Sequence, residues 1–245
     1  MNIISKLGFW NGLNVSLKIA TGNVDNIKLS GIKHPFSLRK KTSDIPTFYQ
    51  IFINDEYRIP PQKKTNIIID GGSNIGLFSI KMKNEYPNAK IICIEPDLDN
   101  VKSIHKNLSP YDNVFIENKG LWSKDTMLKI SDKFNLGKWG MVVEEVEKDG
   151  DVDAISMSSL LKKYSIEYVD ILKLDIETSE KSLFSENYEE WLPKVRLIII
   201  ELHDWAERGC SKPFFEAINK VYNNYSYLPL GENTVIINHD LDDQY

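Results

Sequence analysis

An acidic residue and three glycines at the end of an apolar run form a turn that could bind a polar ligand. In the stretch NIIIDGGSNIGLFSI, residues 66–80, branched apolar residues lead into Asp70, Gly71 and Gly72, and helix-forming residues resume at Gly76. This pattern predicts a buried parallel strand over the first five residues and a helix that begins near Gly76. Glycines let the main chain approach a ligand closely, and the free N–H groups of a helix N-terminus attract it.

The spacing of these glycines does not fit the two common phosphate-binding turns. The dinucleotide pattern G-x-G-x-x-G needs a glycine where Ser73 stands or, in the next frame, where Asn74 and Leu77 stand. The phosphate loop needs a lysine directly after Gly76, where the chain has Leu77. Because Asp70 would repel a polyphosphate, the turn favours a neutral or cationic ligand.

A second apolar run, AKIICIEPDLDN, ends on Glu95, 25 positions after Asp70 (95 minus 70). A carboxylate at the tip of a second strand is well placed to accept hydrogen bonds from ribose hydroxyls. Alternatively, Glu95 caps a helix that begins near Asp97 or Asp99. Combined with the glycine turn, the ribose interpretation is favoured. A ribose without a phosphate clamp points to S-adenosyl-L-methionine, whose positive sulfonium is compatible with Asp70.

Two further apolar runs also end on titratable residues. Asp175 and Glu177 follow the expected fourth strand, and Glu201 and His203 follow the fifth. Ligands of parallel sheets bind at the carboxyl ends of the strands, so we expect these side chains to converge on one rim. Their mutual repulsion requires a cation, hydrogen bonds or protonation to offset it.

Asp175 is the best catalytic candidate, because the fourth strand should neighbour the first and bring it close to the reacting methyl group. The alternative is that Asp175 caps the helix that follows it. Lys173 and Glu177 share the strand face of Asp175. Lys173 either keeps Asp175 ionised or points at the neighbouring strand.

His203 is expected to emerge at the rim, where an imidazole could take a hydroxyl proton near neutral pH. A structural histidine bonded to a loop is the alternative. His203, Glu201 and Asp204 could together hold a divalent ion, but no spaced His or Cys pair accompanies them. The sequence therefore predicts no metal site.

Aromatic and apolar residues follow the expected third strand. Leu121 and Trp122 could pack on an adenine, or they could belong to the core. The position of Trp139, in the irregular stretch that comes next, suggests a residue that lines the substrate pocket.

The elements that must position these residues alternate between strands and helices. The expected strands are 66–70, 90–95, 114–118, 169–176 and 195–203, and the expected helices are 76–86, 99–108, 156–164, 179–192 and 213–222. Residues 124–150 are irregular or antiparallel β, and 225–230 with 234–238 close the chain as a hairpin. Repeated βα units predict an α/β fold with a doubly wound, mostly parallel sheet and an antiparallel C-terminal hairpin, which fits methyltransferases better than dehydrogenases.

The region before the first expected strand has a different character. Short β-like stretches between turns, such as VSLKIA and TFYQIFI, predict a small β-rich extension that ends in a short helix. The stretch IPPQKKTN, residues 59–66, separates it from the rest of the chain. We expect an N-terminal extension over 1–65, lying over the ligand mouth, and one core domain over 66–245.

Composition narrows the classes of partner. The chain has 245 residues, 42% hydrophobic content and a net charge of −5 without a basic stripe, which disfavours nucleic acid. Cys93 and Cys210 are too few for a disulfide framework, so free thiols in a reducing compartment are expected. Because the chain shows neither a signal-peptide pattern nor an apolar run of roughly 18 residues, we expect a cytoplasmic protein without a membrane span.

Several stretches together resemble the FkbM family of S-adenosylmethionine-dependent methyltransferases. They are IIIDGGSNIGLFS, CIEPDLDN, ILKLDIETSE, IIIELHDWAERGCSKPFFEAI and, in the extension, LRKKTSDIPTFYQIFINDEY. The resemblance spans roughly residues 36–220. Two pairs of residues depart from the family pattern: Thr178-Ser179 stand where the family usually has Gly-Ala, and Ser158-Ser159 stand where it has an acidic pair.

The resemblance implies a Rossmann-like class I methyltransferase fold with a seven-stranded sheet, and O-methylation of a hydroxyl on a sugar, a glycan or a natural product. Matching by motif assigns the cofactor turn to Asp70, Gly72, Asn74 and Gly76, the ribose to Glu95, and the substrate face to Asp175. Arg39 and Asp44 fall in the matching extension, at the mouth of the site.

The full set of predicted site residues combines these motifs with the strand-tip argument. The cofactor residues are Asp70, Gly71, Gly72, Ser73, Asn74, Gly76, Glu95, Pro96, Leu121 and Trp122; the catalytic residues are Asp175, Glu201 and His203; and the substrate residues are Arg39, Asp44, Lys173 and Glu177. Two other functions are kept open: a nicotinamide-dependent oxidoreductase, and a non-catalytic methyltransferase-like subunit that uses the extension to bind a partner.

Overall fold

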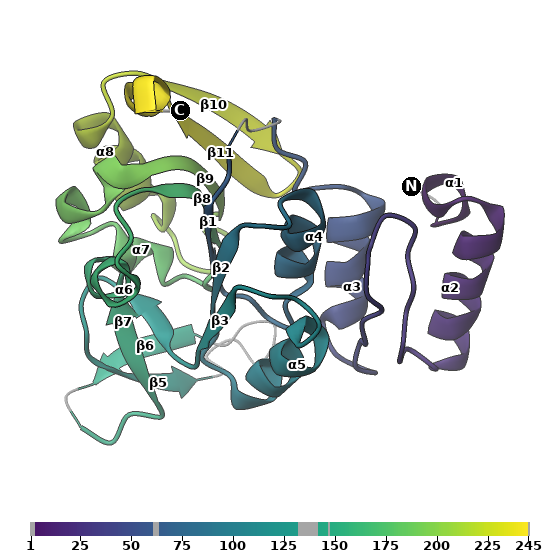
Figure 1. The fold of residues 1–245 in the computed structure, drawn as a ribbon. Helices are drawn as coiled ribbons and strands as arrows, with labels where there is room; N and C mark the ends of the chain where they lie inside the picture. Colours follow the sequence, from purple (N-terminus) through teal and green to yellow (C-terminus); the bar gives the residue numbers. More distant parts are fainter. Residues whose placement is uncertain (1–2, 61–63, 132–141, 147, 245) are drawn as a thin grey trace.

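The main element of the fold is a seven-stranded sheet with helices on both faces (Figure 1). The computed structural model describes residues 3–60, 64–131, 142–146 and 148–244. The strand order is β10-β11-β9-β8-β1-β2-β3. The strands are β1 Ile67–Gly71, β2 Lys90–Ile94, β3 Val114–Glu117, β8 Val169–Leu174, β9 Val195–Glu201, β10 Tyr225–Leu230 and β11 Asn233–Asn238.

The pairing of these strands places the predicted functional tips side by side. β1 lies between β2 and β8, and β8 pairs with β9, all in parallel. β11 runs antiparallel to both β9 and β10. The carboxyl ends of β1, β2, β8 and β9 therefore meet at one edge. This arrangement confirms the predicted α/β fold with its mostly parallel seven-stranded sheet and C-terminal hairpin.

Helices cover the two faces of the sheet in separate groups. α4 Leu77–Glu85 and α5 Leu98–Leu108 lie on one face, and α6 Met157–Tyr164, α7 Glu180–Leu183 and α8 Ser211–Val221 lie on the other (Figure 1). Successive side chains along the central strands point to opposite faces of the sheet and pack in one or the other of two hydrophobic cores. This is expected of a sheet that is buried on both faces. No helix in the described ranges has the length and apolar character needed to span a bilayer.

The long helix predicted over 179–192 is wrong. α7 ends at Leu183, and short 3₁₀ turns follow over Tyr188–Glu190 and Leu192–Lys194. Asn187 takes a left-handed conformation with φ of 62°, which an α-helix cannot accommodate. The apolar spacing nevertheless identified buried side chains correctly, since Phe184, Tyr188, Trp191 and Leu192 all lie in the core.

A second, four-stranded sheet follows β3. It comprises β4 Gly120–Trp122, β5 Met127–Ser131, β6 Val142–Val146 and β7 Val152–Ser156, in the order β4-β7-β5-β6. The antiparallel pair β5–β6 confirms the antiparallel β expected within 124–150, and β5 also pairs antiparallel with β7 just beyond that range. Trp139 lies outside the described residues.

The N-terminal extension is helical, so the prediction of a β-rich segment is wrong. It contains α1 Ile3–Leu7, α2 Phe9–Thr21, α3 Asp44–Phe48 and a short π-helix over Tyr49–Ile53. Ile27 and Phe36 form an isolated β-bridge between these helices. A Cβ on Gly12 of α2 would lie 2.5 Å from the Cα of Ile4, so this glycine lets α1 and α2 pack closely. Tertiary packing thus overrides the β propensity of the sequence VSLKIA.

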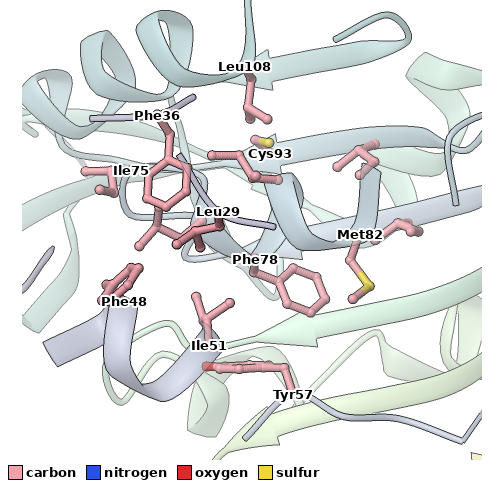
Figure 2. Close-up of a cluster of buried hydrophobic side chains, with 14 of the residues drawn as sticks. Leu29, Phe36, Phe48, Ile51, Tyr57, Ile75, Phe78, Met82, Cys93 and Leu108 are labelled. Carbon is pink, nitrogen blue, oxygen red and sulfur yellow. The ribbon is translucent and has the colours of Figure 1, made fainter. Parts of the chain in front are cut away.

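The extension and the sheet share one hydrophobic core. Phe36, Phe48 and Ile51 pack toward Ile75 and toward Phe78 of α4 (Figure 2). Phe36 also packs against Phe48 and Phe52, at ring-centroid distances of 6.2 and 5.3 Å. The extension is therefore fixed over the sheet by buried aromatic side chains.

The two cysteines are free, as predicted, and both are buried. Cys93 lies in β2, and Cys210 lies immediately before α8. Burial raises the pKa of both thiols to about 12, which keeps them protonated and unreactive at neutral pH.

We expect Phe48→Ala to lower the free energy of unfolding by about 3–5 kcal/mol, because it leaves a cavity in this shared core. The control is Phe9→Ala, since Phe9 is 60% exposed and its removal should change stability by less than about 0.5 kcal/mol. Urea unfolding measures both. Equal effects of the two substitutions would show that the extension is not anchored through Phe48.

Candidate active site

A cavity of about 670 Å³ opens at the carboxyl ends of the central strands. Many predicted site residues line it: Arg39, Gly72, Asn74, Glu95, Pro96, Leu121, Asp175, Glu177, Glu201 and His203. The lining residues that sequence reasoning missed are Ser43, Thr47, Gln50, Ile94, Asp97, Asn100, Gly120, Ile176, Ser179, Trp205 and Glu232. The cavity therefore joins the glycine turn and the acidic strand tips in one space.

Close packing makes glycine necessary at position 72. Gly72 has φ of +72°, and a Cβ there would lie 1.7 Å from the carbonyl oxygen of Asp175. Its N–H donates to the carbonyl of Ile94 at 3.0 Å. The turn after β1 thus packs tightly against the ends of β2 and β8. The other side of the turn faces the cavity.

Four of the predicted cofactor residues lie behind the cavity lining. Asp70 is fully buried and accepts a hydrogen bond from the Ser79 hydroxyl at 2.6 Å. The Ser73 hydroxyl donates to the Asp70 carbonyl and accepts from the N–H of Ile94. A Cβ at Gly76 would lie 2.9 Å from a Leu108 methyl. Together with Gly71, these residues shape the turn, and their direct contact with a cofactor stays a prediction.

Glu95 lines the cavity from the end of β2. Its carboxylate accepts hydrogen bonds from the N–H groups of Asn74 at 2.8 Å and Asp97 at 3.0 Å, and from the Asn100 amide at 3.0 Å. Burial raises the pKa of Glu95 to about 7. The cap of α5 is Asp97, which accepts from the N–H groups of Asp99 and Asn100, so the helix-cap interpretation of Glu95 is wrong.

Lys173, predicted as a substrate residue, is buried beneath the cavity and is not among its lining residues. Its ammonium donates to the Gly72 carbonyl at 2.7 Å and lies 3.6 Å from carboxylate oxygens of both Asp70 and Asp175. Burial opposes the charge of Lys173, but Asp175 and Asp70 raise its pKa above the ordinary value. Of the two roles considered for Lys173, the structure supports that of counter-charge to Asp175.

His203 lies at the centre of an acidic cluster. Its Nε2 is 3.7 Å from Asp175 Oδ1, 3.6 Å from Glu177 Oε2 and 3.6 Å from Glu201 Oε1. Its Nδ1 lies 3.2 Å from Glu180 Oε1. Glu180 was not singled out from the sequence. It is fully buried, and its carboxylate accepts a hydrogen bond from the N–H of Ile176 at 2.8 Å.

The crowding of these groups shifts their pKa values. Burial and the charge of Asp175 raise the pKa of Glu177 to about 8 and that of Glu201 to about 7. Burial opposes the charged form of His203, but the carboxylate of Glu180 and those of the cluster raise its pKa to about 10. His203 thus carries a proton at neutral pH, whereas Glu177 and Glu201 change protonation near it.

Asp44 positions Arg39 at the mouth of the cavity. The fully buried Asp44 carboxylate accepts from the Arg39 guanidinium at 2.8 and 3.0 Å and from its main-chain N–H at 2.6 Å. Arg39 lines the cavity, whereas Asp44 lies behind it and supports Arg39; the substrate contact predicted for Asp44 stays a prediction. Arg39 also approaches the Asn74 amide oxygen at 3.5 Å.

The two residues proposed for adenine packing separate in space. Leu121 lines the cavity. Trp122 points the other way and packs with Leu128, Val152 and Ala154 of the second sheet, so it is a core residue. Trp205, which is 66% exposed, is the tryptophan that lines the cavity among the residues the structure describes.

The extension and the C-terminal hairpin meet across the cavity. Gln50 donates to the Glu232 carboxylate at 2.9 Å, and Glu232 lies between β10 and β11. Both residues line the cavity together with Ser43 and Thr47 of the extension. These residues of the extension were not predicted to line the cavity, because the helical turns on which they lie were expected to be strands.

We expect Gly72→Ala to lower the free energy of unfolding by at least about 3 kcal/mol, because it adds a steric clash to the strain of the left-handed backbone. Gly209→Ala is a matched control, since Gly209 has φ of +76° with no atom within 4 Å of its would-be Cβ. It should cost only about 1–2 kcal/mol. Urea unfolding of both variants tests this, and similar losses would argue against the clash.

Comparison with known proteins identifies the family of the chain. A model of the Methyltransferase FkbM domain matches residues 70–229. Methyltransferase sdnD of Sordaria araneosa is 30% identical over 205 residues, covering 70% of this chain and 78% of that protein. Methyltransferase 1 of Beauveria bassiana is 25% identical over 182 residues, covering 63% and 72%.

Among solved structures, the methyltransferase FkbM from Methylobacillus flagellatus is similar with a TM-score of 0.49 and 14% identity. The likeness covers 71% of this chain and 43% of the other, so the chain spans less than half the length of that structure. The family match, by contrast, covers well over half of the present chain. The protein therefore belongs to the FkbM family of methyltransferases.

Proposed function

We propose that the protein transfers the methyl group of S-adenosyl-L-methionine to a hydroxyl oxygen of a sugar, glycan or natural-product acceptor. The observation that carries this proposal is the single cavity in which a glycine turn and Glu95 face the tips of β8 and β9. The glycine turn and Glu95 suit a ribose-bearing cofactor, and the side chains at the tips of β8 and β9 supply acceptors for a hydroxyl proton.

The charge of the cavity supports a sulfonium cofactor over a dinucleotide. Apart from Arg39 and His203, the charged side chains that the described residues contribute to the lining are acidic: Glu95, Asp97, Asp175, Glu177, Glu201 and Glu232. Arg39 is held bidentately by Asp44. A pyrophosphate would therefore meet repulsion, whereas a positive sulfonium is attracted. This argues against a nicotinamide-dependent oxidoreductase.

The acidic rim can perform methyl transfer through positioning and proton acceptance. Asp175 would orient the acceptor hydroxyl, and its oxygen would attack the sulfonium methyl in line. The C–S bond breaks as the C–O bond forms, leaving a neutral thioether. Glu201, whose pKa is raised to about 7, is better suited than the already protonated His203 to take the hydroxyl proton.

Calorimetry and a turnover assay test the proposal together. S-adenosylmethionine and S-adenosylhomocysteine should bind with micromolar affinity, whereas NAD should give no signal. Labelled S-adenosylmethionine should then transfer its methyl group to members of a panel of monosaccharides, glycosides and hydroxylated natural products. Binding of NAD alone would contradict the cofactor assignment, and adenosyl binding without turnover on any acceptor would favour a non-catalytic subunit.

Asp175→Asn should reduce turnover at least about a hundredfold, because the amide cannot orient the hydroxyl as the carboxylate does. The affinity for S-adenosylhomocysteine should change no more than about threefold, since the predicted cofactor contacts lie at β1 and β2. Asp153→Asn, at an exposed ion pair with Lys119, is the control and should retain activity. Full activity of Asp175→Asn would remove Asp175 from the mechanism.

Affinity for S-adenosylhomocysteine should rise with pH between 6 and 8. A ribose donates hydrogen bonds, so it binds the ionised form of Glu95, whose pKa in the free protein is raised to about 7. At a pH below this pKa the ligand must displace a proton from Glu95, so its affinity should fall by up to about tenfold per pH unit. Glu95→Gln should remove the dependence. Calorimetry across this range measures it, and a flat wild-type profile would contradict the ribose assignment.

A further inference from the structure

The acidic cluster around His203 brings three carboxylates to one buried imidazole nitrogen. His203 is only 2% exposed, and its Nε2 lies 3.6–3.7 Å from one oxygen each of Asp175, Glu177 and Glu201. Ligand atoms of Asp175, Glu177 and His203 all lie within 4.8 Å of one another. Three carboxylates therefore surround one buried imidazole nitrogen.

The other edge of the imidazole determines what this nitrogen can offer. Nδ1 faces Glu180 Oε1 at 3.2 Å, and Glu180 is a fully buried carboxylate fixed by the N–H of Ile176. The negative charge of Glu180 favours a proton on Nδ1, and Nε2 is directed at the cluster, where a bound cation would take the place of a second proton. A buried carboxylate behind an imidazole is the usual support of a metal-ligating histidine.

A proton on Nε2 is a poorer explanation of these distances than a cation. At 3.6–3.7 Å, none of the three carboxylate oxygens is within hydrogen-bond range of Nε2. Two ligand atoms that each lie about 2.2 Å from a tetrahedral cation are about 3.6 Å apart. This separation matches the distances from Nε2 to the three carboxylate oxygens.

The surroundings of Asp175 also suit a cation. Its Oδ2 faces the Lys173 ammonium at 3.6 Å, while its Oδ1 faces His203. Lys173 therefore neutralises the inner oxygen and leaves the other for a ligand. Asp204, considered for a metal site from sequence, instead accepts from the N–H groups of Gly209 and Ser211 and does not take part.

We propose that Asp175, Glu177 and His203 bind one divalent cation of the Mn²⁺ or Zn²⁺ type, with Glu201 beside the site. One nitrogen and several carboxylate oxygens are a donor set that such ions accept. This inference rests on the proposed function for its role: the cation would bind the acceptor hydroxyl and make its proton easier to remove. It departs from the sequence-based expectation of no metal.

The test is a titration of the chelator-treated protein with Mn²⁺, followed by electron paramagnetic resonance of the free ion, and with Zn²⁺ by calorimetry. We expect one site per chain with micromolar affinity. Glu177→Gln should weaken binding at least about tenfold, and the Glu177 side chain, 38% exposed, can change without disturbing the core. Asp175→Asn provides a second variant, and circular dichroism checks the fold of both.

Glu232→Gln is the matched control, because Glu232 lines the same cavity but lies outside the group of ligand atoms. Its cation affinity should stay within about threefold of wild type. Equal weakening in Glu232→Gln and Glu177→Gln would overturn the site in favour of general attraction by the cavity's negative charge.

Binding of S-adenosylhomocysteine, measured separately on the same samples, distinguishes the two proposals. Wild-type protein that binds this ligand but neither Mn²⁺ nor Zn²⁺ would overturn the cation site and leave the proposed function standing. Protein that binds the cation with the expected variant pattern, but not the adenosyl ligand, would support the site while refuting the cofactor assignment.

Discussion

The ammonium group of Lys173 offsets the negative charge that Asp70 and Asp175 bring to the ends of β1 and β8. It lies between β1 and β8, donates to the Gly72 carbonyl and faces both Asp70 and Asp175. A buried carboxylate without such a partner is strongly disfavoured in its ionised form, and breaking a buried pair typically costs about 3–5 kcal/mol. The shape of the glycine turn and the ionisation of the acidic rim thus depend on the same charge.

The acidic residues around the cavity divide into two sets with different physical roles. Asp70, Asp44 and Glu180 are fully buried and each holds another group in place: the turn, Arg39 and His203, respectively. Glu177 and Glu201 keep part of their surface open to the cavity, and their raised pKa values reflect incomplete solvation. Rigid support behind a partly solvated rim is the arrangement that precise positioning of a substrate requires.

Sequence reasoning found the parts of the site that follow from strand order. Parallel strands place their carboxyl ends at one edge, so Glu95, Asp175 and His203 could be assigned to one cavity from the ends of apolar runs. It failed where long-range packing decides the structure. The helix α2 depends on the close approach of α1 at Gly12, and nothing in the local pattern distinguishes the buried Glu180 from an exposed acidic residue at a helix start.

The shared core of the extension and α4 has a consequence for how this protein could diverge. Four residues of the cavity wall, Arg39, Ser43, Thr47 and Gln50, belong to a segment whose aromatic side chains pack directly on the sheet's own helix. Exchange of that segment for one from a relative would therefore alter the packing of the central fold along with the cavity wall. New acceptor preferences are more accessible through individual substitutions on the exposed side of this wall than through recombination of whole segments.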